Sequence, residues 1–82
     1  MKDNENINMN EASSASQTSR ILAYMREGNK ITPGEALSLF GTMRLGARIK
    51  DIEERIGYPP HRERVQVKNR DGKNVWVACY WL

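Results

Sequence analysis

Apolar residues recur at helical spacing in three successive segments of the chain, and two shorter segments with alternating apolar residues follow them. The first segment predicts a helix that begins near residue 18 or 19 and stops at residues 28–29. Its apolar positions are Ile21, Leu22 and Met25. Residues 1–17, by contrast, contain one branched aliphatic residue and cannot bury enough surface to offset chain ordering. The pattern therefore predicts a disordered polar tail, residues 1–17, before one folded domain, residues 18–82.

Capping residues mark both ends of a second helix. The segment TPGE, residues 32–35, matches a capping box with proline at the first helical position, which predicts a helix over residues 33–40. Gly41 supplies a left-handed stop, and Thr42 is suited to cap the next helix at once. Two helices joined by so short a turn form a helix-turn-helix, whose second helix usually enters the DNA major groove.

A third helix is predicted over residues 43–56, and Gly57 ends it in a left-handed cap before a double proline. Its apolar residues occupy a narrow sector of the helix and are Leu45, Ile49, Ile52 and Ile56. Two pairs on its surface have the spacing of ordinary ion pairs, namely Lys50 with Glu54 and Asp51 with Arg55.

The rest of the chain predicts a β-hairpin, residues 64–81, with Asp71 and Gly72 as a two-residue turn. This turn pairs Val67 with Trp76 and thereby fixes the register. The face toward the helices is then mostly apolar and comprises Val65, Val67, Trp76, Ala78, Tyr80 and Leu82. The opposite face places Arg64, Gln66, Lys68 and Arg70 next to Val75, Val77, Cys79 and Trp81.

Charge and composition narrow the classes of function. Residues 20–82 carry 12 basic and 7 acidic side chains, a net charge of +5. A polyanionic partner is therefore expected, although a charge of this size also serves solubility alone. No apolar run approaches the roughly 20 residues that span a bilayer, and the N-terminus lacks the apolar stretch of a signal peptide. Together with a single cysteine, these features predict a cytoplasmic protein that does not contact membranes.

Few residues are suited to catalysis or metal binding. His61 lies in a proline-rich link beside arginines, where a solvated or phosphate-contacting role is expected rather than general base catalysis. Cys79 has no second cysteine and no base at motif spacing, so neither a nucleophilic pair nor a zinc site is predicted. We therefore expect a protein that is not an enzyme, with no catalytic residue, no metal and no cofactor.

Three helices followed by a basic hairpin have the element order of a winged helix-turn-helix, an α+β fold. The chain from Ile21 to Tyr58 also resembles a small domain family with this fold in phage and bacterial mobile-element proteins. The shared motifs are ITPGEAL before the turn, FGTMRLGARI across it and IEERIGY at the end of the third helix, with a final strand that ends in Tyr80 and Leu82. The resemblance covers about residues 20–82 and implies binding to DNA, chiefly through the third helix, with the hairpin as a wing.

The candidate DNA contacts lie on the outward side of the third helix and along the hairpin. Arg44 and Arg48 are predicted to read guanine, because arginine donates two hydrogen bonds to its O6 and N7 atoms, and Ala47 allows close approach. Basic hairpin residues are predicted to contact phosphates or the minor groove. The full set is Thr42, Met43, Arg44, Ala47, Arg48 and Lys50, with Arg62, Arg64, Lys68, Arg70 and Lys73 from the hairpin.

The leading hypothesis is a sequence-specific protein that binds double-stranded DNA, with helix 43–56 in the major groove and hairpin 64–81 as the wing. Its expected role is that of a small transcription regulator or a recombination accessory factor of a phage or mobile element. The alternative is a protein-interaction module without DNA binding, in which the outer strand face of Val75, Val77, Cys79 and Trp81 is a dimer surface or a surface for another partner. A steep salt dependence of duplex binding distinguishes the first hypothesis from the second.

Overall fold

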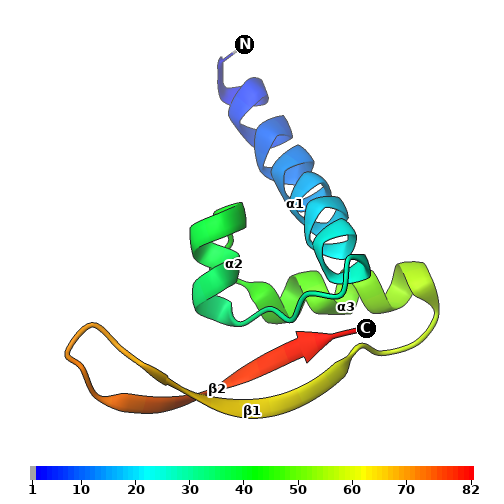
Figure 1. Ribbon diagram of the computed structural model, residues 1–82. Coiled ribbons are helices and arrows are strands. Elements are labelled where there is room, and N and C mark those ends of the chain that lie inside the picture. The colour runs from blue at the N-terminus through cyan, green and yellow to red at the C-terminus, as the bar shows by residue number, and fades with distance from the viewer. Residues whose placement is uncertain (1) are drawn as a thin grey trace.

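The computed structural model describes residues 2–82, with side chains from residue 14 onward. Within these residues it contains α1 (Lys2–Arg26), α2 (Pro33–Phe40) and α3 (Leu45–Ile56), followed by the antiparallel strands β1 (His61–Lys68) and β2 (Asn74–Trp81). The helices lie on one side of the hairpin, and the hairpin turn projects beyond them (Figure 1). This architecture confirms the predicted winged helix-turn-helix fold.

The first helix begins earlier than its apolar pattern indicates. Helical backbone starts at Lys2, so the predicted start near residue 18 is wrong. Polar side chains already contribute before the first apolar position, since Gln17 Nε2 donates to the carbonyl of Phe40 at 3.3 Å. A spacing rule that counts apolar residues does not detect such a polar first part. Most of the predicted disordered tail, residues 1–17, lies outside the residues whose side chains are described, and its disorder stays a prediction.

The hydrophobic core lies where the three helices meet. The predicted apolar positions of α1 and the predicted apolar sector of α3 are both buried there, apart from Ile56, which packs against the core half-buried. Tyr24 and Phe40 close one side in an edge-to-face contact with ring centroids 5.5 Å apart. The buried cluster consists of Ile21, Leu22, Met25, Ile31, Ala36, Leu45, Ile49 and Ile52.

Caps hold α2 and its junction with α3. The hydroxyl of Thr32 accepts the amide of Glu35, and the Glu35 carboxylate accepts the amide of Thr32 at 3.0 Å, which confirms the capping box. Gly41 ends α2 at φ 73°, as predicted. α3 begins two residues later than predicted, because the Thr42 hydroxyl accepts the amide of Arg44 at 3.1 Å and holds these residues in the turn.

The hairpin turn is longer than the predicted two residues. The amide of Asn69 donates to the carbonyl of Lys73 at 2.8 Å, which closes the loop around three residues. The Asn69 side-chain oxygen accepts the amides of both Asp71 and Lys73, at 2.9 and 3.0 Å. Gly72 takes the left-handed conformation at φ 80° that this loop requires. The Asn69 side chain therefore stabilises a turn that the Asp-Gly rule alone does not predict.

The longer turn shifts β2 by one residue, so that Val67 lies opposite Val75 rather than Trp76. Side chains alternate along a strand, and this register therefore sorts the hairpin into two chemically different faces, which corrects the mixed faces predicted from sequence. The face that we call the valine face holds His61, Glu63, Val65, Val67, Val75, Val77, Cys79 and Trp81. The other, the basic face, holds Arg62, Arg64, Gln66, Lys68, Asn74, Trp76, Ala78 and Tyr80.

Ile31 shows which face lies toward the helices. It forms an isolated antiparallel bridge with Tyr80, with both amide-to-carbonyl distances at 2.9 Å. Directly opposed residues point to the same side, and because Ile31 is fully buried, the basic face lies on the helix side. Tyr80 and Leu82 pack against the core as predicted. Trp76 does not pack against the core, and it is 57% exposed.

Candidate nucleic-acid interface

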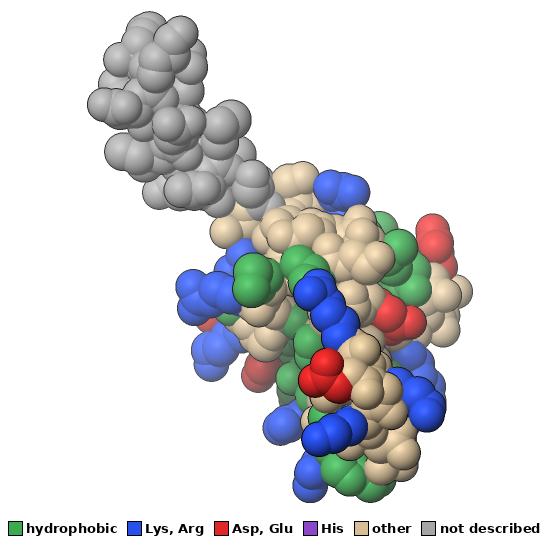
Figure 2. All heavy atoms as spheres, turned by 90° about the vertical axis from the view of Figure 1, so that its left-hand side faces the viewer, with side chains coloured by type: hydrophobic (Ala, Val, Ile, Leu, Met, Phe, Trp, Pro, Cys, Tyr) green, Lys and Arg blue, Asp and Glu red, His purple; other side chains and the backbone are tan. Residues whose placement is uncertain are grey.

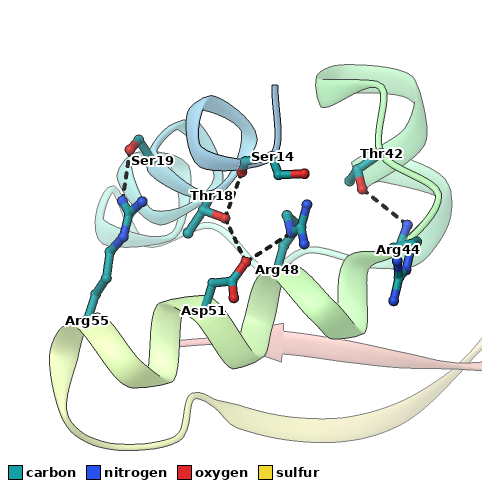
Figure 3. A network of polar contacts seen from close by, with 8 residues as sticks. All are labelled: Ser14, Thr18, Ser19, Thr42, Arg44, Arg48, Asp51 and Arg55. Atoms are coloured by element: carbon teal, nitrogen blue, oxygen red, sulfur yellow. Dashed lines mark hydrogen bonds and ion pairs between the residues drawn. The ribbon is translucent and has the colours of Figure 1, made fainter. Parts of the chain in front are cut away.

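Exposed residues at the start of α3 form the first part of the candidate interface. Met43 is 84% exposed, and Arg44, also exposed, precedes the first helical turn without a side-chain cap bond. Figure 3 shows the Arg44 side chain pointing away from α1. Lys50 is exposed further along the helix, and Ala47 is half-buried between them. The first half of α3 and the residue before it therefore present two cations, Arg44 and Lys50, with the small side chain of Ala47 between them.

Thr42 and Arg48 do not belong to this exposed set. Thr42 is only 4% exposed, and its hydroxyl caps the amide of Arg44 instead of facing solvent. The Arg48 side chain is 13% exposed and points toward α1, with its Nε 3.2 Å from Asp51 Oδ2 (Figure 3). This contact is an ion pair without hydrogen-bond alignment, since Nε is buried with no hydrogen-bond acceptor. Arg48 therefore lies in the helix interface rather than on a groove-facing surface.

A polar network joins α1 to α3 at this point. Asp51 Oδ2 accepts the hydroxyl of Thr18 at 3.3 Å, and the same hydroxyl lies 2.9 Å from the carbonyl of Ser14. One turn later, Arg55 donates to the hydroxyl of Ser19 at 2.8 Å (Figure 3). Of the two surface pairs predicted on α3, neither is among the ion pairs of residues 14–82. The polar residues Asp51 and Arg55 of α3 instead form hydrogen bonds with α1.

The second part of the candidate interface is the hairpin. Each of the five basic residues predicted to contact DNA from the wing is exposed: Arg62, Arg64, Lys68, Arg70 and Lys73. The first three lie on the basic face, and the other two lie in the turn. Figure 2 views the molecule from the end that carries the turn, where Lys and Arg side chains gather around exposed hydrophobic ones. The start of α3 lies toward the same end of the molecule (Figure 1).

The base of the valine face is covered by a separate cluster. Lys30 Nζ lies 3.4 Å from Glu63 Oε2 and 4.5 Å from the centroid of the Trp81 ring. His61 stacks on Trp81 with ring centroids 5.3 Å apart. Burial raises the pKa of the Cys79 thiol, against the opposing effect of Lys30, so the thiol stays protonated at neutral pH and is a poor nucleophile.

The comparisons with known proteins agree with this arrangement. A family model described as a winged helix-turn-helix domain matches residues 16–82. The chain belongs to this family. The match covers the last part of α1, all of α2 and α3, and the hairpin, and a winged helix-turn-helix domain indicates DNA binding in general. No curated protein and no solved structure matches the chain. None of the helices in the described part is long and apolar enough to cross a membrane.

Sequence reasoning assigned Trp76 to the core and so missed it as a surface residue. In the structure its ring lies beside Arg64 on the basic face, with the guanidinium carbon 5.5 Å from the ring centroid. What the sequence did not show is that Arg64 shares a face with Trp76. The signal for this register was Asn69, because an asparagine at the start of a turn accepts the amides that follow it and favours a longer loop. The register, and with it the placement of Arg64 beside Trp76, depends on that side chain.

Proposed function

We propose that this winged helix-turn-helix domain binds double-stranded DNA in a sequence-specific manner, with the start of α3 in the major groove. The observation that carries the proposal is that Met43 and Arg44 are exposed directly before α3, whose start lies toward the end of the molecule that carries the hairpin turn (Figure 1). An arginine there can read guanine, while the hairpin contacts the neighbouring backbone. Ala47 and Lys50 complete the proposed reading surface, and Arg48 is left out of it because it is buried against α1.

The charge gradient along α3 supports the same orientation. Glu53 and Glu54 are exposed in its second half, where phosphates would be repelled, whereas Arg44 and Lys50 lie in the first half. A helix of this kind enters the groove with its N-terminal end first. We infer a binding role rather than a catalytic one. The proposed setting is a cytoplasmic transcription regulator or recombination accessory factor of a phage or mobile element, which the sequence resemblance supports.

Neutralising the wing is expected to weaken binding to all DNA sequences about equally. In a variant with Lys68→Gln, Arg70→Gln and Lys73→Gln, each lost phosphate contact should reduce the slope of log affinity against log salt by about one unit. Titration of labelled duplex at several salt concentrations measures the slope. The matched control is Arg26→Gln, an exposed arginine at the end of α1, which should leave it unchanged. A triple variant with the parent slope would show that the wing does not touch the backbone.

The valine face favours a second candidate function, protein interaction. Its four valines are half-buried and point away from the helices, and the acidic Glu63 at its base is paired with Lys30. A surface of this kind has little charge to attract a polyanion and is suited to an apolar partner. We propose that the partner is a second copy of the chain. The valine face of one copy would then contact the second copy while its α3 and basic face contact DNA.

A charge placed on the valine face is expected to prevent this self-association. Sedimentation should show that the parent forms a dimer and that Val67→Lys is a monomer. Gln66→Lys is the matched control, because it adds the same charge one position away on the basic face, and it should remain a dimer. A monomeric parent at the concentrations used for DNA binding would rule out the dimer.

A further inference from the structure

The basic face carries one feature that neither the core nor a phosphate contact explains. Trp76 is 57% exposed and lies outside the buried cluster and the residues packed against it. The guanidinium carbon of Arg64 lies 5.5 Å from the centroid of its ring. This arrangement holds an indole and a permanent cation side by side on an exposed strand surface.

One side of the Trp76 ring is open to a ligand. Arg64 belongs to β1 and therefore approaches the ring from the β1 side of the hairpin. On its other side β2 is paired only at Tyr80, through the bridge to Ile31, so the edge of β2 next to Trp76 has no strand partner among the described residues. The high exposure of Trp76 agrees with this open edge. A flat group can approach the ring from there without displacing Arg64.

The charges around the Trp76 ring indicate that the flat group is the base of a nucleotide. Among the eight residues of the basic face there are three cations, Arg62, Arg64 and Lys68, and no carboxylate. A base can stack on an aromatic ring, and an adjacent guanidinium can donate hydrogen bonds to the phosphate of the same nucleotide. In an intact duplex both sides of each base are covered by its neighbours. Away from the ends of a duplex, only an unpaired base therefore offers a free surface to the indole.

We propose that Trp76 and Arg64 bind an unpaired nucleotide of DNA, in a single-stranded tail next to the duplex that α3 holds. This inference rests on the proposed function for the duplex part of the ligand and adds a second contact with a different chemistry. The duplex contact depends on Arg44 and on charge, whereas the second contact depends on an aromatic ring. The two contacts can therefore be lost independently.

The test compares a blunt duplex with the same duplex carrying a tail of about eight thymidines, within the range of single-stranded site sizes. In a Trp81→Phe background, Trp76 is the only tryptophan, so its fluorescence reports its own surroundings. We expect the tailed duplex and free oligothymidine to quench this fluorescence, and the blunt duplex to leave it nearly unchanged. Trp76→Val should lower affinity for the tailed duplex by about tenfold and leave affinity for the blunt duplex unchanged.

Matched variants separate stacking from folding and charge. Trp76→Phe should retain most of the preference for the tail, because phenylalanine also stacks, and Arg64→Gln should reduce it. Equal affinity of the parent for both duplexes, without quenching, would overturn the proposal even where duplex binding is strong. An equal loss on both duplexes in Trp76→Val would overturn it too, and would place the indole against intact DNA. Quenching by oligothymidine in a protein that binds no blunt duplex would support the stacking site while rejecting the proposed function.

Discussion

Arg44→Ala is expected to reduce affinity for a selected duplex site by a factor of roughly 5 to 150, equivalent to about 1 to 3 kcal/mol, while the protein stays folded. The fold should survive because the Arg44 side chain is exposed and only its backbone amide takes part in the Thr42 cap. Selection from random duplexes followed by titration of the enriched site measures the effect. Thermal melting of the same variant checks that the fold is retained.

The control for this result is again an exposed arginine outside the candidate interface. Arg26→Ala, at the end of α1, should change the affinity for the selected site little. Should Arg44→Ala bind that site as tightly as the parent does, α3 is not the reading element. Enrichment of no sequence at all by the parent would reject sequence specificity itself.

Asp51→Ala is expected to destabilise the fold by about 1 to 3 kcal/mol, because it leaves the largely buried Arg48 guanidinium without its carboxylate. It also removes one of the two acceptors near the Thr18 hydroxyl, the one that joins α1 to α3. For a domain of this size, such a loss lowers the melting temperature by about 4 to 8 °C for each kcal/mol. Denaturant titration or thermal melting measures it.

A matched substitution on the same helix isolates the role of the network. Glu54→Ala removes a carboxylate three positions away on an exposed part of α3, and its effect should stay within about 0.5 kcal/mol. If both variants have the same melting temperature as the parent, the contact between Arg48 and Asp51 contributes no stability. The DNA affinity of Asp51→Ala, measured well below its melting temperature, should remain close to that of the parent.

The helices were predictable because their signals are local. The capping box at Thr32, the left-handed Gly41 and the apolar sector of α3 each depend on residues within about one or two turns, and each was confirmed. The polar beginning of α1 was missed because its residues contribute through backbone helicity and hydrogen bonds, which apolar spacing does not register. Local capping and periodicity therefore sufficed for most of the helical layer.

The site was less predictable because it depends on neighbours distant in sequence. A helical wheel shows which residues of α3 face the core, but it does not show which element lies beside each flank of the helix. The sequence therefore did not reveal that Arg48 points toward α1. The placement of Arg64 beside Trp76 depended on one side chain, Asn69, which decides whether the turn has two residues or three. A single-residue difference in a turn reverses the face of every residue in the following strand.

The sorted hairpin also has a consequence for how this domain can evolve. Odd-numbered positions of both strands form the valine face and even-numbered positions form the basic face. Hairpin turns are ordinarily places where insertions are tolerated. Here one residue gained or lost between positions 69 and 73 would reverse the faces of β2 relative to β1, so that Trp76 would share a face with Val65 and Val67 instead of Arg64. Natural variants should therefore keep the number of residues in this turn, together with Asn69 and Gly72, while positions 70 and 71 can change in kind.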